Sequence, residues 1–272
     1  MSESPAVDPH AHEEHVGLNE EILRYLEQER MRLGLQPEQM RILDYGCGRG
    51  EAVEGLLAKG YEALGVDISE VSVTIGKERF AELGLNPERL SLLNDDGSMP
   101  YEDDAFDFIY SYQVLEHVED IDKVCAELAR VTRPGALGFH IYPSRHRVVE
   151  GHLFMPVVHW LPKNNLRKWL VKFWTSIGVE PHWPQLEERT VDEKTDVYYA
   201  YSRDETYYRG VSEVSRAFEN QGFSTGLNVV EHPRVQDHSV LGPLARSGAT
   251  SGLLEWAICE FQTVQLTTTH QV

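Results

Sequence analysis

Residues 41–50, Arg-Ile-Leu-Asp-Tyr-Gly-Cys-Gly-Arg-Gly, decide the fold of this chain. A short apolar run ends on Asp44, passes into a glycine-rich turn and is followed by a helical pattern. This order is typical of a buried β-strand that turns sharply into a helix. Because glycine has no Cβ atom, the backbone at Gly46 and Gly48 can turn tightly and press against a ligand. The stretch predicts an α/β fold with a ligand cradle, and the alternative is a glycine turn that serves tight packing only.

The spacing of the glycines distinguishes between two kinds of ligand. The dinucleotide-binding fingerprint needs glycine at its first, third and sixth positions, and the sixth position here is Glu51. A carboxylate at that point disfavours a diphosphate. S-adenosyl-L-methionine (SAM) carries a sulfonium cation and a zwitterionic tail, and it tolerates nearby acids. Asp44 is suited to hold its ammonium group, directly or through water.

Length, charge and cysteine content exclude several functions. The 272 residues fit one α/β domain with an insertion, which we favour, or two small domains, and 44 acidic against 25 basic side chains give a formal charge of −19. Such a charge repels nucleic acid and anionic membranes at long range. Three scattered cysteines favour neither a disulfide framework nor a zinc cage, and we predict no metal site. No apolar run would span a bilayer and no export signal is recognised, so we expect a soluble, cytoplasmic protein.

The first part of the chain differs in character from the rest. Residues 1–16 are polar and carry His10, His12 and His15, but without apolar partners they cannot preform a metal site. We expect a flexible tail there. From Leu18 apolar residues recur at helical spacing, so the domain is expected over residues 17–272.

Two further acids follow predicted strands. The run 63–67 reads as a buried strand that ends on Asp67, about twenty residues beyond the glycines, where an acid can accept both ribose hydroxyls of a nucleoside. The alternative is a surface aspartate that closes a strand. Residues 90–93 form another short strand, and Asp95 in the turn after it could accept the adenine amino group. Buried carboxylates are costly unless they find donors, which favours a functional reason for this layer of acids.

Four segments together carry a resemblance to a known family. They are Asp-Tyr-Gly-Cys-Gly-Arg-Gly (44–50), Val-Asp-Ile-Ser (66–69), Ala-Phe-Asp-Phe-Ile-Tyr-Ser (105–111) and Val-Leu-Glu-His-Val (114–118). In order and spacing, residues 38–142 resemble the class I (Rossmann-like) SAM-dependent methyltransferases, and are similar to those of ubiquinone and menaquinone biosynthesis. The resemblance implies a seven-stranded, mostly parallel sheet with helices on both faces and an antiparallel last strand. It implies a SAM site formed by Asp44, Gly46, Cys47, Gly48, Asp67, Ile68, Asp95, Asp96, Ser111 and Tyr112.

A segment inserted after the fifth strand, residues 143–205, is expected to form a substrate lid. Between residues 140 and 178 six basic side chains stand against one acid, a local reversal of the overall charge. The segment begins at the carboxyl end of a strand, where open α/β sheets bind ligands. The substrate contacts that we predict here are Tyr142, Arg145, His152, His159 and Trp160, although ordinary packing is the alternative for any single histidine. Residues 166–174 read as a basic amphipathic helix that packs on the domain, closes over a substrate or touches a membrane surface.

The sequence thus predicts methyl transfer to a small molecule, with O-methylation of a hydroxyl favoured. Transfer from a sulfonium mainly requires that acceptor, methyl group and sulfur be aligned in a dry pocket. A hydroxyl acceptor also benefits from a base, and His140 and His117 are the candidates. A natural product, a quinone precursor or a sugar of a glycoconjugate fits as acceptor, and the basic insertion favours an anionic or lipid-linked one. The alternative function is a non-catalytic SAM-binding sensor or assembly protein.

Overall fold

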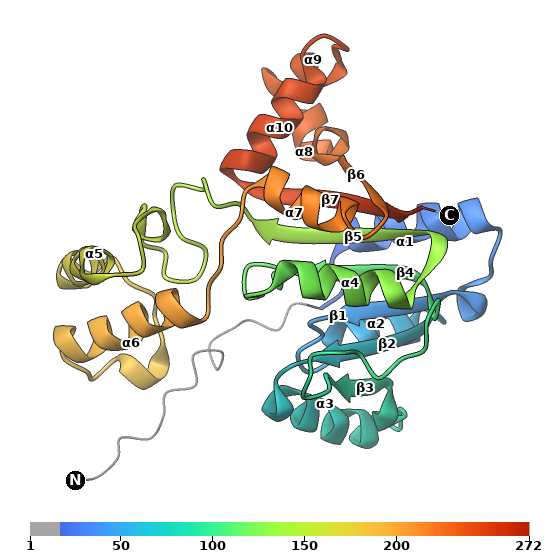
Figure 1. Ribbon diagram of the computed structural model, residues 1–272, viewed down its shortest axis with the longest axis horizontal. Coiled ribbons are helices and arrows are strands. Elements are labelled where there is room, and N and C mark those ends of the chain that lie inside the picture. Colours follow the sequence, from blue (N-terminus) through green and yellow to red (C-terminus); the bar gives the residue numbers. More distant parts are fainter. Residues whose placement is uncertain (1–16, 272) are drawn as a thin grey trace.

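The computed structural model describes residues 17–271, so the flexible tail predicted for residues 1–16 lies outside the described residues. A seven-stranded sheet forms the centre of the protein, with the strand order β3-β2-β1-β4-β5-β7-β6 (Figure 1). The strands are β1 (Arg41–Tyr45), β2 (Glu62–Asp67), β3 (Leu90–Leu92), β4 (Phe106–Tyr112), β5 (Thr132–Pro143), β6 (Phe223–Leu227) and β7 (Thr263–His270). Strands β1 to β5 pair in parallel, and β7 runs antiparallel to β5 and β6. The predicted Rossmann-like sheet with an antiparallel last strand is confirmed.

Ten α-helices accompany the sheet within residues 17–271 (Figure 1). They are α1 (Glu20–Leu33), α2 (Glu51–Ala58), α3 (Glu70–Glu82), α4 (Ile121–Val131), α5 (Asn165–Ser176), α6 (Val191–Asp204), α7 (Val211–Glu219), α8 (Pro233–Gln236), α9 (Leu241–Arg246) and α10 (Ser251–Phe261). Short 3₁₀ turns lie at Pro37–Gln39, Pro87–Arg89, Val158–Trp160, Pro184–Leu186 and Val229–Glu231. None of these helices combines the length and the apolarity that a membrane crossing requires.

The core consists of two layers, one on each face of the sheet. On one face α1, α2 and α3 bury residues such as Leu26, Val53 and Phe80 against the strands. On the other face α4, α7 and α10 contribute to a second cluster that includes Leu128 and Phe218. Because both faces are covered, the central strands β1 and β4 are buried along nearly their whole length instead of alternating between buried and exposed residues. The sheet is therefore rigid, and its carboxyl edge is the place where loops can hold ligands.

The chain between β5 and α7 forms a lobe that contains α5 and α6 (Figure 1). It has its own apolar cluster, formed by Leu153, Met155, Val158, Val171, Trp183, Leu186, Tyr198 and Tyr201. Arg167 is buried in this lobe and donates to the backbone carbonyls of Leu161 and Ser202 at 2.9 and 2.7 Å. The hydrogen bonds from Arg167 to these backbone carbonyls therefore help to hold α5 in place, in addition to its apolar contacts.

Helix α5 buries a different face from the one its apolar pattern suggests. Its buried residues are Arg167, Val171 and Thr175, whereas Trp169 and Phe173 are 63% and 43% exposed. Of the apolar side chains in residues 166–174, Leu170 and Trp174 pack against the apolar cluster of the lobe, whereas the two exposed rings do not dock there. Lys168 and Lys172 form ion pairs with acids of α6, Asp196 and Asp192, so part of the positive charge of the helix is neutralised locally.

Candidate active site

The glycine loop after β1 adopts the left-handed backbone that its composition predicts. Gly46, Gly48 and Gly50 have φ angles of 81°, 54° and 82°, a region that side chains rarely adopt. A Cβ atom on Gly46 would lie 2.3 Å from Cγ2 of Val114, so this position also lacks room for a side chain. The loop is a cradle whose shape depends on the absence of these side chains.

Hydrogen bonds tie this loop to the end of β2. The N–H groups of Gly46 and Cys47 donate to the carbonyl of Val66 at 2.8 and 3.1 Å. The Asp67 carboxylate accepts from the N–H of Gly48 at 2.7 Å and from that of Ser69 at 2.8 Å. A single carboxylate therefore fixes both the glycine loop and the beginning of α3.

Asp44 is buried at the end of β1 and lines the same cavity. Burial raises the pKa of its carboxyl to about 7, and the negative charges of Asp67 and Glu51 act in the same direction, while the hydroxyl of Tyr110 opposes the shift. A positive ligand group beside Asp44 would reverse the effect of burial. The site is thus prepared for a cation.

One cavity of about 1320 Å³ extends from the glycine loop to the lobe that carries α5 and α6. Of the predicted SAM-binding residues, seven line it: Asp44, Gly46, Cys47, Gly48, Asp67, Ile68 and Tyr112. Glu51 lines it as well, which makes this end of the cavity unsuitable for a diphosphate. The donor-poor, acidic cradle fits the sulfonium and ammonium groups of SAM.

Three of the predicted SAM-binding residues lie elsewhere. The side chains of Asp95 and Asp96 are exposed and do not line the cavity, and Asp96 accepts from the N–H and the hydroxyl of Ser98. Leu93 and Gly97, on either side of these acids, do line it. Ser111 is fully buried and its hydroxyl lies 2.9 Å from Nδ1 of His140.

His140 does not fit the predicted role of a catalytic base. It is buried in the sheet, stacks on Phe218 of α7 and lies 3.4 Å from the hydroxyl of Thr268 on β7. Burial lowers the pKa of its ring to about 3, and the ring does not line the cavity. Its neighbour Ile141 lines the cavity instead, because successive side chains of a strand point to opposite faces.

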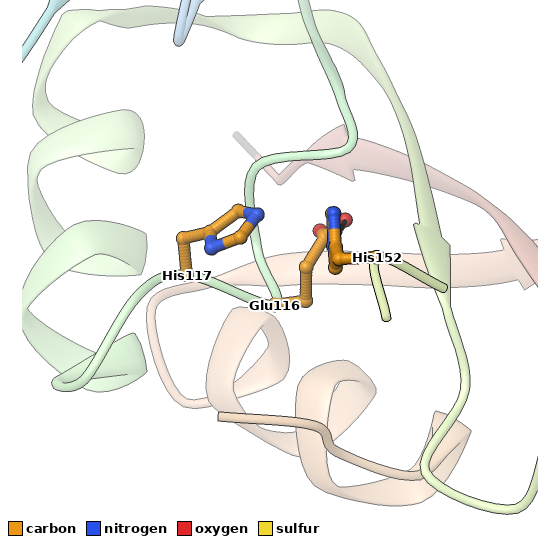
Figure 2. A group of neighbouring side chains, drawn as sticks. All are labelled: Glu116, His117 and His152. Carbon is orange, nitrogen blue, oxygen red and sulfur yellow. Dashed lines mark ion pairs between the residues drawn. The ribbon is translucent and has the colours of Figure 1, made fainter. Parts of the chain in front are cut away.

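His117 and His152 come together in the wall of the cavity, although they are distant in the sequence. Their ring centroids lie 4.8 Å apart, and Nε2 of His152 lies 3.7 Å from Oε1 of Glu116 (Figure 2). The cavity here is also bordered by Gln113, which follows β4, and by Arg147 from the inserted segment. Side chains from two distant parts of the chain therefore meet here.

The other predicted substrate residues do not line the cavity. Tyr142 is buried in the core between the sheet and its helices, and Arg145 pairs with Glu213 of α7 at 2.8 Å. His159 is buried behind Tyr208, with ring centroids 4.8 Å apart, and the indole of Trp160 donates to the carbonyl of Arg147. Tyr142 thus belongs to the main core, the other three side chains stabilise the lobe and its attachment, and a direct contact with substrate does not fit the positions of any of the four.

Three residues at or near the cavity have surroundings that the sequence does not indicate. Glu116 is buried next to His117, a neighbour that the Val-Leu-Glu-His-Val segment already displayed. Glu150 accepts from the N–H of His152 at 2.8 Å, which no sequence pattern indicates. Gln113 has a φ of 57°, a strained backbone for a residue other than glycine, and its N–H donates to the carbonyl of Ile141.

Comparisons with known proteins agree with this geometry. Residues 43–139 match a family described as "Methyltransferase domain". The sterol 4-C-methyltransferase strm-1 of Caenorhabditis elegans is 35% identical over 98 residues, which are 36% of this chain and 29% of that protein. A ubiquinone biosynthesis O-methyltransferase of Mesorhizobium japonicum is 32% identical over 129 residues, 46% of this chain and 51% of that protein.

A solved structure extends the likeness beyond the matched segment. The structure of PKMT2 from Rickettsia typhi has a TM-score of 0.55 at 18% identity and covers 91% of this chain and 52% of that one. At this identity the likeness concerns the fold, and the chain spans about half or less of the length of the proteins named here. Residues 43–139 thus carry a methyltransferase domain, in a chain whose fold is that of the class I, Rossmann-like SAM-dependent methyltransferases.

Proposed function

We propose that this protein transfers the methyl group of SAM to a hydroxyl of a small molecule. The observation that carries the proposal is that one cavity joins the glycine loop and its acids to a group of polar side chains around His117 and His152. Bound SAM supplies a methyl group on a positively charged sulfur, which leaves as a neutral thioether. The protein therefore needs to hold both partners in line and to exclude water.

On the cofactor side, each group has a role that its chemistry supports. Asp44 holds the ammonium group of the methionine part, and Gly46 and Gly48 allow close approach of that part to the backbone. The carboxylate of Asp67 accepts from the ribose hydroxyls. Because Leu93 and Gly97 line the cavity and Asp95 does not, the backbone of this turn borders the adenine end.

On the acceptor side, Glu116, His117 and His152 form what we name the acceptor cluster. It orients the hydroxyl and removes its proton, so that the oxygen can attack the methyl carbon. Two relatives bear names that concern small acceptors, one an O-methyltransferase of ubiquinone biosynthesis and the other a sterol 4-C-methyltransferase. We favour oxygen as the methylated atom because the acceptor cluster offers groups that take up a proton. A natural product, a quinone precursor or a sugar of a glycoconjugate would fit.

The inserted segment 143–205 serves as the substrate lid in this proposal. His152, Phe154 and Trp183 from this segment line the cavity, which supports a role in choosing the acceptor. Of the basic side chains of the segment, Arg147 is the one at the cavity wall, and an anionic or lipid-linked acceptor would meet it there. Arg145, Lys168 and Lys172 are engaged in ion pairs with neighbouring acids.

The test uses SAM with a labelled methyl group. The full-length protein is incubated with this SAM and a panel of hydroxylated aromatic, sterol and sugar compounds, and products are separated and analysed by NMR. We expect label in a methyl ether, and no label with the Asp67→Ala variant. His146→Ala is the matched control, because Nδ1 of His146 lies 2.6 Å from Oε1 of Glu260 and neither residue lines the cavity.

The possible outcomes separate the proposal from its rival. Label on carbon or nitrogen would contradict the choice of a hydroxyl while leaving methyl transfer in place. Tight binding of S-adenosylhomocysteine without label in any compound, including a metabolite extract, would favour a SAM-binding sensor or assembly protein.

A further inference from the structure

The geometry points to a metal site: Glu116, His117 and His152 bind one divalent transition-metal cation of the zinc or cobalt type. The inference deepens the proposed function, on which it rests for its consequence, because the cation would lie in the acceptor half of the cavity. The ligand atoms of the three side chains all lie within 4.8 Å of one another (Figure 2). The sequence analysis predicts no metal site from the scattered cysteines, and this cluster leaves no local motif because His152 is far along the chain from the other two residues.

The carboxylate of Glu116 is the first reason. Glu116 is 1% exposed, and within the described part of the chain neither carboxylate oxygen accepts a hydrogen bond. Nε2 of His152 lies 3.7 Å from Oε1 of Glu116. A buried carboxylate without donors costs several kcal/mol unless a positive charge compensates it. A cation between Glu116 and the two rings would supply that charge.

The hydrogen bond of His117 is the second reason. Nδ1 of His117 lies 2.7 Å from the carbonyl oxygen of Glu205, and a carbonyl can only accept. Nδ1 therefore carries the proton, and in the neutral ring the lone pair is on Nε2. Histidines that bind metals commonly donate their other N–H to a backbone carbonyl in this way, which fixes the tautomer and the orientation of the ring.

His152 is held by a second carboxylate that lies behind it. Glu150 is buried and accepts from the N–H groups of His152 and Leu153, and it also accepts from the hydroxyl of Tyr208. These bonds fix the backbone that presents the ring of His152 to Glu116. The N–H of Tyr207 similarly donates to the carbonyl of Glu116 at 2.6 Å. Each ligand thus has a neighbour that orients it.

The set of ligand atoms limits the kind of cation. Two imidazoles and one carboxylate suit zinc, cobalt, iron or nickel, whereas magnesium and calcium prefer oxygen ligands alone. Ligand atoms around such a cation stand about 3.4 Å apart, so small side-chain rotations would close the site. Three protein ligands leave at least one position for an acceptor oxygen.

This position has a direct chemical consequence. A divalent cation lowers the pKa of a hydroxyl that coordinates to it. The acceptor then gives its proton to solvent and attacks the methyl carbon as an oxyanion, the carbon–sulfur bond breaks, and its electron pair stays on sulfur. In this form the acceptor cluster removes the proton through the cation instead of through one of its histidines.

The test measures binding of the metal itself. The full-length protein carries His10→Ala, His12→Ala and His15→Ala, so that these histidines cannot contribute, and chelator-treated samples are titrated with Co²⁺ while visible absorption is recorded. We expect one equivalent of tightly bound Co²⁺, displaced by Zn²⁺. Glu116→Gln and His152→Ala should each weaken binding by about 100-fold, while His146→Ala should bind as the parent does.

Two further measurements distinguish failure of the metal site from failure of the proposed methyl transfer. Binding of S-adenosylhomocysteine by Glu116→Gln is expected to match the parent, which shows that this variant is folded. Absence of stoichiometric Co²⁺ binding in the parent, or unchanged binding in a folded Glu116→Gln variant, would overturn the metal site. Methyl transfer that persists in full after chelation would overturn its role as activator but leave the proposed methyltransferase intact.

Discussion

The carboxylate of Asp67 at the end of β2 accepts a hydrogen bond from the N–H of Gly48, with 2.7 Å between Oδ2 and N. Its other oxygen accepts from the N–H of Ser69 at 2.8 Å. An ionised carboxylate offers about four lone-pair positions, so two remain for further donors. Asp67 can therefore fix the glycine loop and still accept from the two hydroxyls of a ribose.

Asp67→Asn tests this double role. Asparagine has nearly the same size, but its NH₂ group cannot accept from a backbone N–H, so one of the two bonds is lost together with the charge. We expect binding of S-adenosylhomocysteine, measured by calorimetry, to weaken by about tenfold or more. Asp95→Asn is the matched control and should change the affinity by less than about twofold, since its side chain is exposed and outside the cavity. An equal loss in both variants would refute this division of roles.

Gly46→Ala tests the shape of the cradle. The added Cβ would lie 2.3 Å from Val114, and the alanine would have to adopt a φ of 81°. Gly135→Ala separates the cost of the backbone conformation from the cost of the clash. Gly135 has a φ of 82°, but a Cβ there would meet no atom of the described residues within 4 Å. We expect chemical denaturation to show a loss of about 1 kcal/mol for Gly135→Ala and at least about 2 kcal/mol more for Gly46→Ala. Similar losses would mean that Val114 moves aside freely.

The raised pKa of Asp44 predicts a pH dependence of cofactor binding. Without ligand the carboxyl has a pKa of about 7, and the ammonium group of the cofactor favours the ionised form. Below pH 7 binding must therefore displace a proton, so the affinity for S-adenosylhomocysteine should fall by up to about tenfold per pH unit between pH 7 and 5.5. Above pH 7 it should be constant up to about pH 8, since the carboxylate is already ionised there.

Asp44→Asn provides the control for this dependence. The variant has no titrating group at this position, so its affinity should be weaker and should vary little between pH 5.5 and 8. A wild-type affinity that is flat over this range would show that Asp44 is ionised before the cofactor binds.

The strands and glycine loop followed from the sequence because they depend on local features. An apolar run that ends on an acid, followed by glycines in fixed spacing, has few other structural solutions. His140 and Tyr142 were assigned to the cavity because they lie near the end of β5. Both point to the face that α7 and α10 cover, and the alternation along the strand brings Ile141 to the cavity instead. The end of a strand can be predicted from sequence more easily than the face to which each side chain points.

The inserted lobe could not be predicted in detail for a different reason. The basic side chains at 145, 168 and 172 suggested an anion-binding surface, but their partners, Glu213, Asp196 and Asp192, lie far along the chain. The same holds for Glu150 and His152, whose contact with the segment around Glu116 depends on how the lobe packs. Long-range pairing of this kind leaves no periodic signal in a single sequence.

The buried ring of His140 predicts how stability depends on pH. Its pKa is about 3 in the folded protein and about 6.5 when unfolded. Unfolding therefore takes up a proton below pH 6.5, so the free energy of unfolding should fall as pH decreases, by up to about 1.4 kcal/mol per pH unit from this group. Above pH 6.5 the contribution is fully present. Denaturation curves of the parent and His140→Gln between pH 7.5 and 5 should converge as pH falls; parallel curves would contradict the assignment of a neutral, buried ring.

We expect the hydrogen bonds of Arg167 to hold the lobe together. This side chain is 5% exposed, and its guanidinium donates to the carbonyls of Leu161, His159 and Ser202, which connects the start of α5 with the end of α6. Arg167→Met keeps much of the apolar stem but leaves these buried carbonyls without their donors, so we expect a loss of about 2–4 kcal/mol in the free energy of unfolding.

Lys168→Met removes the adjacent positive charge and is the matched control for Arg167→Met. Lys168 pairs with the exposed Asp196, so its loss should change stability by less than about 1 kcal/mol. Limited proteolysis should cut Arg167→Met between residues 143 and 205 faster than the parent or Lys168→Met, because the lobe has its own apolar cluster and can open by itself. If both variants were cut at the same rate, the carbonyl contacts of Arg167 would not be what holds the lobe together.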